Sequence, residues 1–368
     1  MQTPVVSIIM PVHNTESFIE KSLSSLQSQT LKNVEIICIN DASTDKSENI
    51  IRSAMQEDRR IKLIQTPVQS GSSTTRNYGL KKATGQYIMF CDSDDWYEPR
   101  MCELMVEAIK TKDVDFVMCD AHIINRDPLR GSGADYHRLN TFGFHKLGQN
   151  NKFNIRSLIW NKIFKKTLID EYNICFPEGT NGGDYSFVIQ YLAVSSCAFG
   201  LNQCLYNYVL REGSVVSNAL REKSKTTVNR IKNYGHIYKF LVQHQLIQEN
   251  ASFFAQAMWH EINWLVTTHK GKSFLEEVIH IGQEVMQDFD MNHIPDALPE
   301  KQLLDAVKNK QYAFLCAYFE IDPRLRFLNA KKTKIKLLGI NIISIKSSKK
   351  YTQIKIFGIP LLQIEHLH

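Results

Sequence analysis

The first hundred residues alternate short apolar runs with segments of amphipathic helical pattern, and this alternation constrains the fold more than any other feature. The runs are nearly all apolar, as buried parallel strands are, and strands alternating with helices indicate a doubly wound α/β sheet. Residues 16–29 have helical spacing, and Asp45 with Glu48 resembles a capping box that opens the next helix. The expected strands are residues 5–10, 36–40, 61–65 and 87–91.

Polar clusters follow three of these expected strands. Ligands of a doubly wound sheet bind beyond the carboxyl ends of its strands, so these clusters predict one ligand site at one edge of the sheet. They comprise Pro11, Val12, His13 and Asn14 after the first strand, residues 41–45 after the second, and residues 92–95 after the fourth.

The third cluster holds Asp92, Asp94 and Asp95 around Ser93. Carboxylates this close repel one another unless a cation or hydrogen-bond donors lie among them. A hard divalent ion, Mg²⁺ or Mn²⁺, suits oxygen ligands of this kind together with diphosphate oxygens. The alternative is a solvated helix cap without a ligand.

Asp41 and Arg76 are the other candidate binding residues. Asp41 follows an apolar run, where its carboxylate can accept a hydrogen bond from a nucleobase N–H or a ribose hydroxyl. Arg76 follows the donor-rich loop 69–75, and guanidinium groups and helix N-termini both favour phosphate partners. The alternatives are a helix cap at Asp41, a solvent-exposed turn at residues 11–14 and a surface ion pair for Arg76.

Four motifs, in this order and spacing, resemble the family-2 inverting glycosyltransferases of the GT-A fold. They are VSIIMPVHN at residues 6–14, VEIICINDASTD at 34–45, TRN at 75–77 and FCDSDDW at 90–96. The resemblance covers the N-terminal third of the chain. A looser resemblance to bacterial enzymes that build lipopolysaccharide and capsule continues through WNKIFK at 160–165 and FPEG at 176–179.

The resemblance implies a UDP-sugar donor, a divalent metal and a glycan or lipid-linked acceptor. In such enzymes the turn after the first strand and the acid after the second hold uracil and ribose, and the later acid of the D-x-D ligates the metal. The implied contacts to the nucleotide-sugar are Pro11, Val12, His13, Asn14, Asp41, Arg76, Asp92 and Ser93. The implied ligands of Mn²⁺ or Mg²⁺ are Asp94 and Asp92.

Two positions depart from the family pattern. His13 stands where a tyrosine is commonest, which would weaken stacking on the base. The family's Glu-Asp pair appears as Gly183 and Asp184, so the acidic neighbour of the presumed catalytic base is missing. We expect Asp184 to be the general base, with a helix cap as its alternative role, and with Glu178 or acids near Asp135 as the alternative bases.

Other functions remain alternatives. The altered pair at residue 183 leaves open a nucleotide-sugar-binding module without catalysis. A sugar-phosphate nucleotidyltransferase would normally carry a glycine-rich loop after the first strand, where residues 11–14 have no glycine. Glycoside hydrolysis would need two carboxylates that flank the bond, with water as the acceptor.

The 368 residues, 43% of them hydrophobic, are enough for more than one folded unit. We expect a GT-A domain at residues 1–218, with a nucleotide-binding half at 1–98 and an acceptor half at 99–218. A mainly helical appendix at 219–326 and a lysine-rich β-hairpin tail at 327–368 follow. The tail is an internal repeat that would turn near Gly339 and Gly358, with Pro360 at an edge.

Charge and cysteines indicate where the protein works. Residues 330–364 hold eight lysines and no acid, so the net charge of +6 belongs to the tail and does not indicate nucleic-acid binding. The tail would suit an anionic membrane surface. The absence of a C-x-x-C pair, of a long apolar span and of a signal-peptide pattern predicts a cytoplasmic protein. The lysine-rich tail would place it on the inner face of the cell membrane, and the alternative is a self-contained β-subdomain with a solvated rim.

Overall fold

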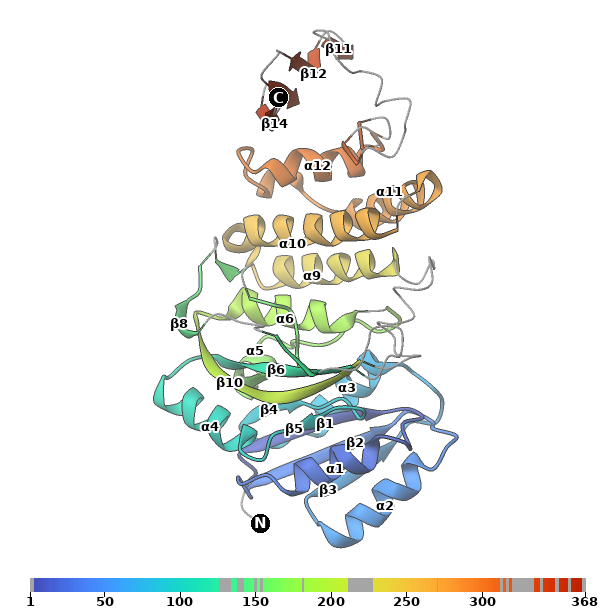
Figure 1. Cartoon of the computed structure of the whole chain (residues 1–368), viewed down its shortest axis with the longest axis vertical. Helices are drawn as coiled ribbons and strands as arrows, with labels where there is room; N and C mark the ends of the chain where they lie inside the picture. Colours follow the sequence, from blue (N-terminus) through green and yellow to red (C-terminus); the bar gives the residue numbers. More distant parts are fainter. Residues whose placement is uncertain are drawn as a thin grey trace.

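The computed structural model describes most of the chain (Figure 1). The described residues are 3–125, 134–137, 142–148, 151–152, 155–180, 182–210, 228–269, 271–311, 314–315, 318–319, 334–337, 340–347, 351–356 and 359–365. The expected boundaries near residues 218 and 326 lie outside these ranges, and the boundary at residue 98 falls between strand β5 and helix α4.

The N-terminal half of the main sheet is parallel, as the apolar runs predict. Strands β3, β2, β1 and β4 lie side by side in that order, and every residue of β2 is buried. The elements are β1 (Val6–Val12), α1 (Ile19–Gln27), β2 (Val34–Asn40), α2 (Ser47–Glu57), β3 (Ile61–Gln65), α3 (Ser72–Lys82) and β4 (Tyr87–Phe90). Because β1, β2 and β4 run parallel, the three polar clusters meet at one edge of the sheet.

The expected capping box at Asp45 and Glu48 is wrong. Helix α2 begins at Ser47, and the Glu48 carboxylate accepts a hydrogen bond from Arg52 instead of from the amide of Asp45. The Asp45 carboxylate accepts from the amides of Ser47 (3.0 Å) and Glu16 (2.9 Å), so it connects two loops rather than closing a box within one.

The sheet continues with a mixed half. Strand β9 runs antiparallel to both β4 and β6, and β10 runs parallel to β6 with a bulge between residues 200 and 206. The elements are β5 (Trp96–Tyr97), α4 (Met101–Thr111), β6 (Phe116–Asn125), β7 (Ala134–His137), β8 (Gly143–Lys146), β9 (Lys162–Lys165), α5 (Lys166–Glu171), α6 (Gly183–Val194) and β10 (Cys197–Leu210). The polar segment 125–151 contains β7 and β8, because β6 and β10 supply partners for them.

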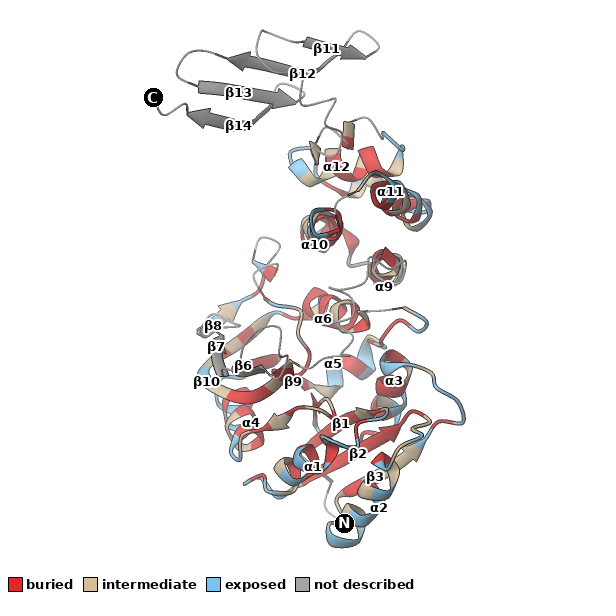
Figure 2. Cartoon of the chain, turned by 45° about the vertical axis from the view of Figure 1, so that its right-hand side comes forward, coloured by how far each residue is buried: buried red, intermediate tan, exposed pale blue. Residues whose placement is uncertain are grey.

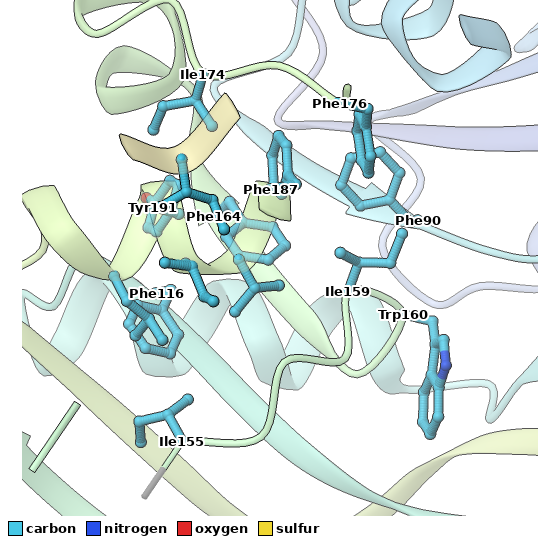
Figure 3. Close-up of a cluster of buried hydrophobic side chains, with 14 of the residues drawn as sticks. Phe90, Phe116, Ile155, Ile159, Trp160, Phe164, Ile174, Phe176, Phe187 and Tyr191 are labelled. Atoms are coloured by element: carbon cyan, nitrogen blue, oxygen red, sulfur yellow. The ribbon is translucent and has the colours of Figure 1, made fainter. Parts of the chain in front are cut away.

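Aromatic side chains join α6 to the sheet (Figure 3). Phe187 of α6 stacks on Phe176 at a centroid distance of 4.5 Å and meets Phe90 and Phe164 edge-on at 5.5 Å each. These rings are buried, and Figure 2 shows buried residues continuing through the sheet and α6. This cluster holds the start of α6 beside the carboxyl end of β4.

The expected helical appendix stacks on α6 along the long axis of the molecule (Figure 1). It contains 3₁₀ turns at Asn229–Ile231 and Met291–His293 and the helices α9 (Lys232–Gln243), α10 (Ile247–Thr268), α11 (Lys272–Met286) and α12 (Pro299–Lys308). Buried Lys152 donates to Asn250 of α10 (2.8 Å) and to the carbonyl of Ala193 in α6 (3.0 Å), which ties the appendix to the sheet domain. Among the helices of the described ranges, none could cross a membrane.

The tail forms its own four-stranded antiparallel sheet, in the order β11-β12-β13-β14. Its strands are β11 (Lys334–Leu337), β12 (Ile340–Ser347), β13 (Tyr351–Ile356) and β14 (Ile359–Glu365). The two expected hairpins are confirmed, and Pro360 lies in β14 at an edge of the sheet.

Phe187→Ala is expected to lower the free energy of unfolding by about 3–5 kcal/mol, because it leaves a cavity among three other rings. The control is Phe144→Ala on β8, where the residue is 58% exposed. A surface substitution of this kind should change stability by less than about 0.5 kcal/mol. Urea denaturation of both variants measures the difference, and equal losses would contradict the assignment of the aromatic cluster as the joint.

Candidate active site

The turns after β1 and β2 brace each other at the edge of the sheet. The Asn14 side-chain oxygen accepts a hydrogen bond from the backbone amide of Thr44 (2.8 Å), and the backbone amide of Asn14 donates to the Ser43 hydroxyl (3.1 Å). Asn14 and Ala42 have φ values of 49° and 51°, the left-handed region that asparagine tolerates better than most residues. The expected nucleotide-binding turn is therefore held in one conformation by its neighbour.

His13 packs against the same neighbour. Its Nδ1 lies 2.7 Å from the backbone carbonyl oxygen of Asp41, and its Nε2 lies 3.3 Å from the side-chain amide nitrogen of Asn14. Because a carbonyl only accepts, Nδ1 carries the proton and Nε2 is left as the acceptor. His13 and Pro11 are both half-buried, and Val12 between them, the last residue of β1, is buried.

Asp41 holds the loop that leads into α3. Its Oδ1 accepts hydrogen bonds from the Ser70 amide (2.8 Å), the Ser70 hydroxyl (2.7 Å) and the Thr66 hydroxyl (2.9 Å), and its Oδ2 accepts from the Gly71 amide (2.7 Å). Burial acts to raise the pKa of Asp41, but these hydrogen bonds outweigh it and lower the pKa. Asp41 is therefore ionised and shapes the loop before α3, and it does not cap α2.

The acidic turn after β4 divides into two kinds of carboxylate. Asp95 is buried, with Oδ2 accepting from the Tyr206 hydroxyl and Oδ1 from the Val209 amide, both at 2.7 Å. Burial, followed by the charges of Asp94 and Asp92, raises the pKa of Asp95 well above its ordinary value. Asp95 is thus an internal anchor to β10, and the partly exposed pair Asp92 and Asp94 is what faces the edge.

Ser93 lies on the inner side of the same turn. Its hydroxyl accepts from the Thr15 hydroxyl (3.1 Å), and its carbonyl accepts from the Ser22 hydroxyl (2.9 Å). The residue is buried. Ser93 therefore connects the acidic turn to α1 and to the turn after β1.

Arg76 joins the acidic turn to α6. It is 4% exposed, and its two terminal nitrogens donate to Asp92 Oδ1 (2.7 Å) and Asp184 Oδ1 (2.6 Å). Burial acts to lower the pKa of Arg76, but Asp184 and Asp92 more than compensate and raise the pKa. The N–H group on Nε is buried without a hydrogen-bond partner in the part of the chain that the structure describes. The surface ion pair considered as an alternative is replaced by a buried bridge.

Asp184 lies within the first turn of α6 and is not its cap. The cap position is Gly182, with φ 73°, and no side chain caps the helix. Burial raises the pKa of Asp184, Arg76 lowers it, and nearby Asp92 raises it, with a net upward shift. Its side chain is 35% exposed, so the carboxylate is within reach of a substrate.

The residue before it, Gly183, is packed directly against α3. A Cβ atom at this position would collide with the Ser73 hydroxyl. A glutamate, as in the family pattern, would therefore require the Ser73 hydroxyl to rotate away, Ser73 to be smaller, or α3 and α6 to separate. The missing acid thus coincides with a close contact between the two helices.

The sequence did not reveal Tyr206 and Asn77 as supports of this site. Tyr206 of β10 donates to Asp95 and accepts from the Asp92 amide at 3.2 Å. Asn77 donates to the carbonyl of Phe176 (2.9 Å) and to Glu178 (3.1 Å), and accepts from the Phe176 amide (2.9 Å). The partners of Tyr206 and Asn77 are distant in sequence. For Tyr206 the available signal was that a buried carboxylate such as Asp95 needs donors, and for Asn77 it was its place in the TRN motif.

Asp92 and Asp94 are the residues that could hold a metal. The described ranges contain no group of three or more His, Cys, Asp or Glu side chains arranged to hold an ion. Mg²⁺ commonly uses one or two carboxylates and completes its coordination with substrate phosphates and water. Two partly exposed carboxylates on one turn fit that use, with Asp92 also bound through Oδ1 to Arg76.

Gly183→Ala is expected to lower the free energy of unfolding by about 1–3 kcal/mol, because the added methyl group overpacks the contact with Ser73. Ser73→Ala in the same chain should recover much of the loss by removing the colliding hydroxyl. Gly148→Ala is the control, since a Cβ there meets no atom within 4 Å. A double-mutant cycle by thermal unfolding measures the coupling, and strictly additive effects would contradict the packing argument.

Comparison with known proteins shows which family the sequence resembles. The profile described as Glycosyl transferase family 2 matches residues 7–168. The putative glycosyltransferase EpsH of Bacillus subtilis (strain 168) is 31% identical over 258 residues, covering 68% of this chain and 72% of EpsH. The putative teichuronic acid biosynthesis glycosyltransferase TuaG of the same organism is 26% identical over 235 residues, covering 61% of this chain and 86% of TuaG.

A solved structure extends the likeness to the whole fold. The crystal structure of residues 1–349 of S. aureus TarS in complex with UDP-GlcNAc superposes with a TM-score of 0.72 at 18% identity. The match covers 95% of this chain and 96% of that one, so the helical appendix is part of the shared fold. Together with the match to EpsH, this confirms the expected family and its GT-A fold: the chain belongs to glycosyltransferase family 2.

Proposed function

We propose that this protein transfers a sugar from a UDP-sugar to a hydroxyl group of a glycan or lipid-linked acceptor, with inversion at the anomeric carbon. We place the reaction in the synthesis of a bacterial surface polysaccharide such as lipopolysaccharide or capsule. The UDP-GlcNAc bound to TarS supports the donor class, and the name of TuaG supports the pathway class. The bridge from Asp92 through Arg76 to Asp184 carries the proposal, because it brings a donor-side and an acceptor-side carboxylate to one place.

The nucleotide would lie against the turns after β1 and β2. In this proposal uracil and ribose contact Pro11, Val12, His13, Asn14, Asp41, Asp92 and Ser93. The half-buried ring of His13 offers the base a smaller stacking surface than tyrosine would. Arg76 and the N-terminal turn of α3 favour the diphosphate, and the unpartnered Nε–H of Arg76 supports this role.

Asp94 and Asp92 would hold Mn²⁺ or Mg²⁺ together with the diphosphate. The bound ion would neutralise the charge that grows on UDP as it leaves. Asp95 would hold the turn without binding the ion, because its two oxygens accept from Tyr206 and Val209.

Asp184 would take the proton of the acceptor hydroxyl. As the acceptor oxygen forms its bond to the anomeric carbon, the bond from that carbon to the β-phosphate oxygen breaks and UDP leaves from the opposite face. The proton moves to Asp184, which must therefore start ionised. Arg76 keeps this carboxylate ionised against the upward pressure of burial and of Asp92 on its pKa.

A UDP-release screen over nucleotide-sugars, with manganese and with or without acceptors, tests the proposal. A transferase releases UDP mainly when an acceptor is present. Equal release into water would indicate a hydrolase, release of pyrophosphate from a nucleoside triphosphate and a sugar phosphate would indicate a nucleotidyltransferase, and UDP binding without turnover on any acceptor would indicate an inactive binding module.

The tail gives a further part of the proposal. Its eight lysines would bring the enzyme to an anionic membrane on the cytoplasmic side, where a lipid-linked acceptor resides. Co-sedimentation with anionic liposomes should be strong at low salt and weak at high salt. Equal binding by a chain shortened before residue 327 would show that the tail is not responsible.

Asp184→Asn is expected to lower turnover by about 10²–10⁴, because the amide cannot accept the proton. UDP binding, measured by calorimetry, should be unchanged, and Asp170→Asn on α5 serves as an exposed control. Since the pKa of Asp184 is raised, wild-type activity should fall on acidification at a higher pH than for an ordinary aspartate, and Arg76→Gln should move this limb to higher pH still. Full turnover in Asp184→Asn, with loss in Glu178→Gln, would move the base to Glu178.

Asp94→Ala is expected to remove nearly all activity while leaving the unfolding temperature close to that of the wild type, because the side chain lies on a partly exposed turn. Chelation with EDTA should have the same effect, reversed by added Mn²⁺. The control Asp113→Ala removes a carboxylate whose side chain is 95% exposed. An enzyme indifferent to EDTA would contradict the metal assignment.

A further inference from the structure

Helices α9 and α11 flank two adjoining open hollows that belong to no part of the donor site. Their volumes are about 350 Å³ and about 440 Å³. Sites for small molecules commonly measure roughly 300–1,000 Å³, so each hollow is large enough to take a ligand. Both are lined by Gly235, Lys239, Val285 and Asp288, and together they form what we call the α9–α11 groove.

One end of this groove is the loop that leads into the candidate base. Pro177, Glu178 and Thr180 line the larger hollow. The Thr180 hydroxyl donates to Asn233 of α9, and Asn233 donates to the carbonyl of Gly182 (3.2 Å), two residues before Asp184. The groove therefore starts at the segment that opens α6.

The same end is also fastened to α3. Glu178 accepts a hydrogen bond from Asn77 (3.1 Å), the residue after Arg76. An acceptor chain whose terminal hydroxyl lay at Asp184 would meet Glu178 and then the groove as it left the site. The route follows from the contacts of one loop with α3, α6 and α9.

The larger hollow presents charges of both signs. Lys232 and Lys239 supply hydrogen-bond donors, and Glu178, Glu284 and Asp288 supply acceptors. Burial lowers the pKa of His236, which therefore adds no positive charge at neutral pH. Three carboxylates disfavour a polyanion and two ammonium groups disfavour a polycation, whereas hydroxyl groups can both accept and donate.

The smaller hollow is more apolar. Tyr238 and Phe289 stack at a centroid distance of 4.1 Å along it, and Val242 beside them is 46% exposed. Tyr238 and Phe289 are themselves buried, so the exposed apolar surface here is mainly that of Val242, which suits C–H groups of a sugar. The groove is polar near the active site and more apolar farther away. It thus fits a ligand that carries both hydroxyl groups and C–H groups.

We propose that the α9–α11 groove binds neutral saccharide units of the acceptor, beyond the unit that receives the transferred sugar. The proposal rests on the proposed function and names the acceptor class more closely. It assigns to the helical appendix a role in acceptor recognition.

Gly235 allows a direct test, because it lines both hollows and a Cβ there meets Val285 only at 3.6 Å, an ordinary contact. Gly235→Phe should fill the groove, and Gly235→Ala is the matched control that leaves it open. Lys239→Gln removes the ammonium charge and shortens the side chain without adding volume, with Lys110→Gln on α4 as its control. The second pair keeps the test decisive if Gly235→Phe fails to fold.

The probes are soluble hexasaccharides of glucose, galactose and N-acetylglucosamine, with binding followed by NMR titration of the full chain. At least one should bind the wild type, Gly235→Ala and Lys110→Gln equally, and bind Gly235→Phe and Lys239→Gln at least tenfold more weakly. UDP affinity should be the same in all five proteins. Absence of binding to the wild type, unchanged binding to both groove variants, or stronger binding of dextran sulfate would overturn the proposal.

The outcome is separable from that of the proposed function. If no acceptor stimulates release of UDP, the transferase proposal is overturned. The saccharide titration still gives its own result, because it measures binding to the groove. Conversely, transfer to acceptors with equal KM values for one-unit and six-unit chains, unchanged in Lys239→Gln, would leave the transferase proposal standing and remove the groove from acceptor binding.

Discussion

The buried guanidinium of Arg76 is the interaction on which the arrangement of the site depends. It lies in α3 and binds Asp92 after β4 and Asp184 in α6 at the same time. A buried charge without partners is strongly destabilising, and loss of either carboxylate would leave the Arg76 guanidinium with one charged partner in place of two. The separation between the acidic turn and the start of α6 is therefore set by one side chain.

The surroundings of α3 hold that side chain in place. Asn77, the next residue, pairs with the backbone of Phe176, whose ring stacks on Phe187 of α6. Ser73, one turn earlier, lies directly against Gly183. Helix α3 thus contacts α6 through a salt bridge, through the segment before α6 and through the close approach of Ser73 to Gly183.

The local sequence pattern was sufficient to predict the parallel sheet, because strands buried on both faces, such as β1 and β2, are nearly all apolar. It was insufficient for β7 and β8, whose polar residues form strands because β6 and β10 offer partners. It also could not separate Asp95 from its neighbours, since the donors that bury it come from Tyr206 and Val209 on a distant strand. The sequence thus located the acidic turn. Tertiary contacts determine that Asp95 is buried and that Asp92 and Asp94 are partly exposed.

The division of that turn also bears on the metal. Asp95 is buried and anchored to β10, which leaves Asp92, Asp94 and Asp184 facing the edge with Arg76 as the cation shared by two of them. A diphosphate is itself an anion, so its approach to these three carboxylates is opposed by like-charge repulsion. A divalent ion between the turn and the diphosphate would reverse the sign of that interaction, because it attracts both. This charge balance among the described residues supports the proposed metal on electrostatic grounds, independently of any motif.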